Sequence, residues 1–196
     1  MSLENELIDV DDSVLLVIDV QDRFLEKYSE TDQEVLLNRI GWVVDVAVRL
    51  QVPVVATAED IAQLGGVSPS IADKFSADVP VLNKMIFGLA ADSEIMAAVK
   101  NTGRHTAILV GFETDVCIAH SAIGLLQQEY KVAVVSDATA SPGRSHEIGL
   151  ERMRRAGVVI SSVKSLFYEW VRTVERCDRF MQKYKKEIGL PQGIVL

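Results

Sequence analysis

Short runs of β-branched and other apolar residues alternate with longer amphipathic stretches along most of the chain. The apolar runs predict strands at 14–19, 53–57, 79–83, 106–110, 131–135 and 158–161. The longer stretches predict helices at 33–50, 93–100, 115–129 and 146–155. Strands that alternate with helices form parallel sheets whose two faces are both covered. The pattern therefore predicts an α/β fold with a mostly parallel sheet between two layers of helices.

The segment 164–186 carries a further periodic pattern near the carboxyl end. Its apolar side chains recur at alternating spacings of three and four residues, at Phe167, Trp170, Val174, Cys177, Met181 and Tyr184. This spacing predicts one long helix with a single apolar stripe, in which Cys177 acts as a small hydrophobe. The stripe is more apolar than one helix usually requires, so we expect it to form the interface of a homo-oligomer. Packing of the stripe on the sheet of its own subunit is the alternative.

Composition narrows the classes of protein to which the chain can belong. Its 196 residues, 48% of them hydrophobic, predict a single domain, 1–196, with a full core. The 28 acidic and 20 basic residues give a net charge of −8, which argues against a nucleic-acid partner. No apolar run reaches the roughly 18 residues of a membrane span, and the acidic start at 4–12 is unlike a signal peptide. Two cysteines form no disulfide framework, so the sequence indicates a cytoplasmic protein with free thiols.

Three residues with reactive or charged side chains follow predicted strands. Asp19 ends the first strand, Lys84 follows the third, and Cys117 comes shortly after the fourth. Because parallel strands point the same way, these carboxyl ends share one edge of the sheet, where open α/β sheets bind their ligands. Thr114 as N-cap would put Cys117 in the first turn of a helix, whose unpaired N–H groups favour a thiolate. We therefore expect a thiol pKa below the free value of about 8.5.

The residues around these three positions resemble a known family, the isochorismatase-like cysteine hydrolases, which include nicotinamidases and pyrazinamidases. The resemblance spans about residues 13–166 and rests on three segments in order: 15–24 (LLVIDVQDRF), 84–88 (KMIFG) and 110–118 (VGFETDVCI). It implies a three-layer α/β/α fold of the Rossmann-like kind, with a six-stranded parallel sheet. It also implies a catalytic triad of Asp19, Lys84 and Cys117, and a cis peptide bond between Phe112 and Glu113.

These residue types suit the hydrolysis of an amide through a thioester. Asp19 can take the proton of the Cys117 thiol, which then attacks the amide carbonyl and releases ammonia or an amine. Lys84 reduces the repulsion between the two negative charges. Backbone N–H groups around Glu113 and Cys117 are expected to stabilise the oxyanion. Water, activated by the same carboxylate, would then cleave the thioester.

The stretch after the second predicted strand is the position at which a metal-binding site would be expected. Metal-binding members of the family carry an Asp-x-His segment there, but residues 57–66 (TAEDIAQLGG) contain no histidine. The histidines elsewhere lack ligand spacing, and two carboxylates alone make a poor transition-metal site. Glu59 and Asp60 are a weaker candidate for a hard cation. The stretch resembles the metal-free branch of the family, so we expect neither a metal nor another cofactor.

The leading hypothesis is a metal-free cysteine amidohydrolase that acts on a small neutral or weakly polar amide. Phe24 and Phe87 are candidate walls of its substrate pocket. One alternative is an isochorismatase that cleaves a vinyl ether, and another is a binding protein that retains the fold without catalysis. Release of ammonia, release of pyruvate, or an unreactive Cys117 would distinguish the three.

Overall fold

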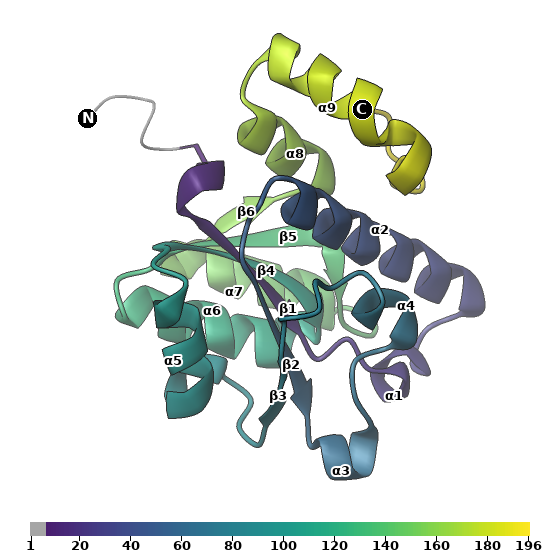
Figure 1. Cartoon of the computed structure of the whole chain (residues 1–196). Helices are drawn as coiled ribbons and strands as arrows, with labels where there is room; N and C mark the ends of the chain where they lie inside the picture. Colours follow the sequence, from purple (N-terminus) through teal and green to yellow (C-terminus); the bar gives the residue numbers. More distant parts are fainter. Residues whose placement is uncertain (1–6) are drawn as a thin grey trace.

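The computed structural model describes residues 7–196, in which six parallel strands form one sheet (Figure 1). Residues 1–6, including the start of the acidic segment, lie outside the described residues. The order across the sheet is β3-β2-β1-β4-β5-β6. The strands are β1 Ser13–Ile18, β2 Val54–Glu59, β3 Val81–Lys84, β4 Thr106–Phe112, β5 Lys131–Ala140 and β6 Val159–Ser161. All six predicted strands are confirmed, and β5 extends well beyond its predicted end.

Helical elements connect the strands, and polar side chains cap several of them. Ser29 accepts a hydrogen bond from the Asp32 N–H at the start of α2, and Asp92 accepts from Glu94 and Ile95 at the start of α5. Such caps satisfy N–H groups that have no partner within the helix. The elements are η2 Val10–Asp12, α1 Asp22–Leu25, α2 Glu30–Arg49, α3 Ile61–Leu64, α4 Pro69–Ala72, η3 Leu89–Ala91, α5 Ser93–Asn101, η4 Thr114–Ile118, α6 Ala119–Gln127, α7 Ser145–Ala156, α8 Val163–Val171 and α9 Val174–Ile188. Within residues 7–196, none of these helices is long and apolar enough to cross a membrane.

Two hydrophobic cores cover the two faces of the sheet. Successive side chains of a strand point to opposite faces. In β1, Leu15 and Val17 join a core with α2 and α8, whereas Val14, Leu16 and Ile18 join a core with α5, α6 and α7. Figure 1 shows these two groups of helices on opposite sides of the sheet. The architecture is therefore three layers, α/β/α, as the resemblance implies.

The strand order changes direction between β1 and β4, and these two strands approach each other closely at their carboxyl ends. Gly111 in β4 has φ +119°, and a Cβ at this position would lie 1.9 Å from the carbonyl oxygen of Ile18. Only glycine permits both this conformation and this approach. In open α/β sheets the crevice at such a point is the usual place for a ligand. The fold therefore provides a ligand-binding position where β1 ends and β4 leads into η4.

The predicted single helix over 164–186 is wrong, because the chain breaks at Arg172 and Thr173. Arg172 has φ +63°, a left-handed conformation that ends α8. Its guanidinium donates a hydrogen bond to the carbonyl of Ile8, 3.1 Å away. Thr173 then caps α9, because its hydroxyl accepts from the Arg176 N–H at 3.2 Å. A polar cap inside the periodic pattern thus produced two helices.

The break also divides the residues of the expected stripe between two helices, on which their exposure differs. Phe167 and Trp170 are each only 1% exposed and pack into the core on the α2 side. Met181 and Tyr184 are partly buried against the same core, whereas Val174 is 80% exposed. The prediction of one exposed stripe on the last helix is therefore wrong, because its largest side chains stabilise the subunit itself.

Trp170→Ala should lower the free energy of unfolding by about 3–5 kcal/mol, the usual loss for a large aromatic core residue. The indole also donates a hydrogen bond to the Ser13 hydroxyl at 3.1 Å, which the variant removes. Val174→Ala, at the exposed position, should change the free energy by at most about 0.5 kcal/mol. Urea unfolding of both variants measures the difference. A Trp170→Ala protein as stable as wild type would show that this side chain is not a core residue.

Candidate active site

Asp19 lies directly after β1 and is completely buried, at 0% exposure. Its backbone has φ +52°, a left-handed conformation that aspartate adopts more readily than most residues. Its N–H donates to the carbonyl of Thr57 at 3.0 Å, and the Thr57 hydroxyl donates to Asp19 Oδ1 at 3.0 Å. The neighbouring strand β2 therefore fixes the direction of the carboxylate.

Lys84 ends β3, and its ammonium group is the centre of the site. Nζ lies 2.9 Å from Asp19 Oδ2, 3.6 Å from Glu59 Oε2 and 3.6 Å from Cys117 Sγ. It also donates to the carbonyl of Ile86 at 3.0 Å. The Lys84 side chain is fully buried, so its charge acts with little screening by water. The three residues predicted from the strand ends thus meet around one ammonium.

Cys117 lies within η4, a π-helical turn that follows β4 and continues into α6. π-helical turns are rare and often occur at functional sites. The Phe112–Glu113 peptide bond just before the turn is cis, the form that the resemblance implies. α7 packs tightly against the turn, because a Cβ at Gly149 would lie 2.8 Å from the Cα of Asp115. The thiol is therefore held on a rigid turn at the edge of the sheet.

The expectation that Thr114 caps this turn is wrong. Glu113 holds the N-cap position and makes no side-chain cap hydrogen bond. The Thr114 hydroxyl instead hydrogen bonds with His146 Nδ1 at 2.9 Å, which links the turn to α7. The Glu113 carboxylate forms an ion pair with Lys27 at 2.7 Å. Contacts with α7 and the α1 region thus replace a local cap.

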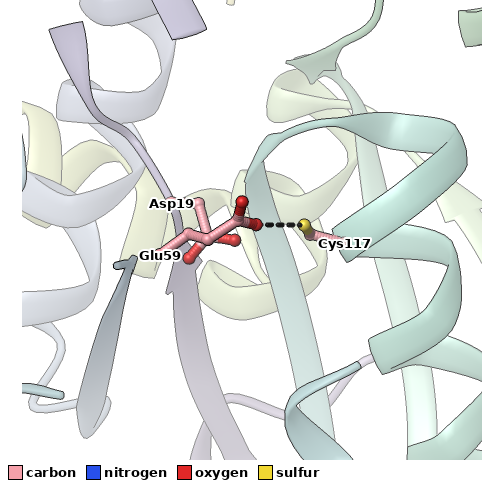
Figure 2. A group of neighbouring side chains, drawn as sticks. All are labelled: Asp19, Glu59 and Cys117. Carbon is pink, nitrogen blue, oxygen red and sulfur yellow. Dashed lines mark hydrogen bonds between the residues drawn. The ribbon is translucent and has the colours of Figure 1, made fainter. Parts of the chain in front are cut away.

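Glu59 is a fourth member of the site. It ends β2, between the strands that carry Asp19 and Lys84, and its Oε2 accepts a hydrogen bond from Cys117 Sγ at 3.4 Å (Figure 2). The sequence alone indicates Glu59 only as a candidate ligand for a hard cation. Its position at the end of a parallel strand, on the same edge as Asp19 and Lys84, was the signal that could have identified it.

Burial and the two carboxylates determine the protonation of the site. Burial raises the pKa of Asp19, and Lys84 opposes only part of this rise. Burial lowers the pKa of Lys84, but the nearby charges of Asp19, Cys117 and Glu59 outweigh it and raise that pKa overall. Lys84 is therefore charged at neutral pH. Asp19, with its raised pKa, is a better proton acceptor than an exposed aspartate would be.

The expected low pKa of the thiol is wrong. Cys117 is only 3% exposed, and burial followed by the negative charge of Asp19 raises its pKa above the ordinary value. Lys84 lowers it and Glu59 raises it further. One cation beside two carboxylates does not compensate for the desolvation of a thiolate. The raised pKa favours the protonated thiol, so formation of a thiolate requires a neighbouring group that accepts its proton.

One group of side chains in the described part of the chain could hold a metal ion. Asp19, Glu59 and Cys117 offer ligand atoms that all lie within 4.8 Å of one another. The ammonium of Lys84 contacts all three and compensates their charge where a cation would bind. Asp60, the other candidate ligand, does not belong to the group. The donor set therefore fits an internal ammonium better than a metal.

The two candidate pocket residues line different hollows. Phe24 lines a cavity of about 430 Å³ together with Lys27, Leu64 and Glu59. Phe87 is 52% exposed and lines a separate groove of about 310 Å³, which includes His120 and contains no member of the triad. The cavity beside Phe24 is thus the one that borders the reactive group, through Glu59.

Asp19→Asn should increase the rate at which iodoacetamide alkylates Cys117 at neutral pH. Removing the negative charge lowers the thiol pKa, and a neighbouring charge shifts a pKa by about 1–3 units. Peptide mass mapping gives the rate, with Cys177 in the same sample as an internal reference. An unchanged or slower rate would contradict the effect assigned to Asp19.

Comparison with known proteins identifies the family and the fold. The chain matches the isochorismatase domain family over residues 13–165. It is 33% identical over 161 residues to a secreted isochorismatase effector, Isc1, of Phytophthora sojae, covering 80% of this chain and 76% of that protein. The fold is similar to the MAR1 ribonuclease of Caenorhabditis elegans, with a TM-score of 0.82, 20% identity, and coverage of 97% and 98% of the two chains. It is equally similar to the YcaC protein of Escherichia coli, an octameric hydrolase of unknown specificity, with a TM-score of 0.82, 21% identity, and coverage of 93% and 92%. The chain therefore belongs to the isochorismatase family.

Proposed function

We propose that this protein is a cysteine hydrolase that cleaves a small amide or a related C–N bond through a thioester. The observation that supports this most is the contact of one buried ammonium, on Lys84, with both Asp19 and the Cys117 thiol. A nucleophile, a base and a compensating charge within hydrogen-bonding reach are the requirements of covalent acyl transfer. Membership of a family of hydrolases agrees with this chemistry.

In the proposed reaction, Asp19 takes the proton of the thiol while Sγ attacks the carbonyl carbon. The carbonyl electron pair moves to oxygen, and backbone N–H groups around Glu113 and Cys117 stabilise the resulting oxyanion. Such donors contribute about 3 kcal/mol each in comparable sites. When the carbonyl reforms, the C–N bond breaks and the nitrogen leaves with the proton held by the carboxyl group. A thioester remains on Cys117, which water then hydrolyses.

Lys84 has an electrostatic role in this scheme. Proton transfer from the thiol to Asp19 leaves a thiolate in a buried site beside Glu59. The ammonium lies 3.6 Å from both Sγ and the Glu59 carboxylate, so it stabilises the thiolate as the charge develops. Its raised pKa keeps it protonated throughout. Lys84 thus has no need to transfer a proton.

The size of the adjoining cavity supports a small substrate. About 430 Å³ beside Phe24 and Glu59 is within the usual range for small-molecule sites. An amide panel with detection of released ammonia tests the reaction, and pyruvate release would instead indicate vinyl ether cleavage. No turnover together with no acyl adduct on Cys117 would indicate a binding protein.

We also propose that the protein is a cytoplasmic homo-oligomer that needs neither nucleic acid nor membrane as a partner. An octameric hydrolase with the same fold supports the oligomer. Since Phe167 and Trp170 are buried in the subunit, a contact through the last helices would involve the exposed part of the predicted stripe, such as Val174. The net charge of −8 supports the exclusion of nucleic acid.

Asp19→Asn and Lys84→Met should both abolish most amide turnover, but in different ways. Loss of the base should reduce turnover by about 10² to 10⁴ while the thiol remains open to alkylation. Loss of the ammonium should raise the thiol pKa further, so turnover and alkylation should fall together. Ammonia release and iodoacetamide labelling, on protein shown to be folded by circular dichroism, measure the two effects. Wild-type turnover in Asp19→Asn would overturn the assignment of the base.

Exhaustive chelation should leave amide turnover unchanged, because Lys84 already supplies the positive charge that the donor atoms require. Ammonia release is measured before the protein is treated with a chelator, and again after the chelator has been removed by dialysis. Loss of activity that one particular divalent ion restores would identify Asp19, Glu59 and Cys117 as metal ligands instead.

A further inference from the structure

We propose that Glu59 is a second catalytic carboxylate, which activates the water that hydrolyses the thioester. This inference rests on the proposed function and divides the proton transfers between two residues: Asp19 serves the attack by the thiol, and Glu59 serves the release of the acyl group. Two observations carry it, namely the contact of Glu59 with the reacting sulfur and its exposure to the adjoining cavity.

The first observation is the contact with the nucleophile. Glu59 Oε2 lies 3.4 Å from Cys117 Sγ and 3.6 Å from Lys84 Nζ. A carboxylate at this distance from Sγ is also close to the carbonyl carbon of an acyl group bound there. General bases act over one hydrogen bond or through one water molecule, so the position suits a base for the attack of water on that carbon.

The second observation is the difference in exposure between the two carboxylates. The Asp19 side chain is 0% exposed, and its oxygens already face Thr57 and Lys84. The Glu59 side chain is 21% exposed and lines the cavity of about 430 Å³. Water in this cavity can therefore contact Glu59, whereas Asp19 does not line the cavity and has no exposed surface.

Gln21 holds the end of β2 in place for this role. The Glu59 N–H donates to Gln21 Oε1 at 2.8 Å, and Gln21 Nε2 donates to the carbonyl of Glu59 at 2.9 Å. Nε2 also donates to the carbonyl of Gly65 at 2.7 Å, and Gln21 itself is completely buried. A backbone fixed on both sides limits the freedom of the Glu59 side chain, and a base must be positioned in advance to be effective.

During deacylation, Glu59 accepts one proton and later returns it. Water loses a proton to the Glu59 carboxylate while its oxygen forms a bond to the thioester carbon. The tetrahedral intermediate collapses with cleavage of the C–S bond, and the carboxylic acid product is released. The departing sulfur takes the proton from the Glu59 carboxyl group, which restores the thiol and its hydrogen bond to Oε2.

The test uses p-nitrophenyl acetate, which acylates thiols and releases a coloured anion that needs no proton. The full-length wild-type protein should give a burst of p-nitrophenolate and then a steady rate. Glu59→Gln should retain the burst but lower the steady rate by about 10² to 10⁴, so that acetylated Cys117 accumulates in intact-mass and peptide spectra. Asp19→Asn should instead leave the hydrolysis rate of acetylated Cys117 at the wild-type value, because Glu59 is still present. Glu151→Gln, a change in a surface glutamate on α7, is the matched control and should behave as wild type.

Hydroxylamine separates a catalytic role from a structural one, since this stronger nucleophile attacks a thioester with little need of a base. It should restore release of the acetyl group from Glu59→Gln. A wild-type steady rate in Glu59→Gln, or a parallel loss of burst and steady rate that hydroxylamine does not restore, would overturn the role of Glu59 while leaving the thioester mechanism intact. Absence of acetylation at Cys117 in the wild-type protein would overturn the proposed function and this inference together.

Discussion

The buried ion pair between Lys84 and Asp19 is the interaction on which the site depends. The two residues end β3 and β1, which are separated in the sheet by β2, so the ammonium reaches across the end of the intervening strand. The same ammonium lies close to Glu59, at the end of β2, and to Cys117, in the turn after β4. A buried ammonium without a partner would be strongly unfavourable. Its need for negative neighbours is met by the carboxylates at the ends of β1 and β2, and the thiol after β4 lies beside the same ammonium.

In the proposed mechanism, the same charges explain why the thiol is protonated at rest and still acts as a nucleophile. Two carboxylates beside one ammonium disfavour a thiolate, and burial adds to this effect. The thiol must then transfer its proton to a neighbouring carboxylate, and the raised pKa of Asp19 prepares that group to receive it. Proton transfer within the site keeps its net charge constant. The thiolate of Cys117 therefore forms as the carbonyl group of a bound substrate accepts its electron pair.

The sequence predicted the parts of the fold that periodicity determines. Buried parallel strands appear as short continuous apolar runs, and each polar residue that ends such a run lies at a known edge of the sheet. Asp19, Lys84 and Cys117 could be placed together on these grounds. The positions of their side chains relative to one another depend on the twist of the sheet and on the π-helical turn, which leave no periodic signal in the sequence.

The errors had local physical causes. The break before α9 depends on the left-handed Arg172 and the cap at Thr173, which a continuous apolar spacing concealed. Threonine is a common N-cap residue, but Thr114 hydrogen bonds with His146, a partner more than 30 positions away in the sequence. The pKa of Cys117 depends on burial and on the charges of Asp19 and Glu59, which the start of a helix does not reveal. In the last two cases a tertiary contact outweighed a local preference, and in the first a local cap outweighed the apolar spacing.

A double-mutant cycle on the ion pair tests the central claim most directly. Asp19→Asn, Lys84→Met and the double variant would each be unfolded in urea. Each single change leaves a buried charge poorly compensated and should lower the free energy of unfolding by about 3 kcal/mol or more. The double variant removes both charges, so its loss should be smaller than the sum of the single losses by about 1–3 kcal/mol. Losses that add to within about 0.5 kcal/mol would contradict the account, because they would show that Lys84 and Asp19 do not depend on each other.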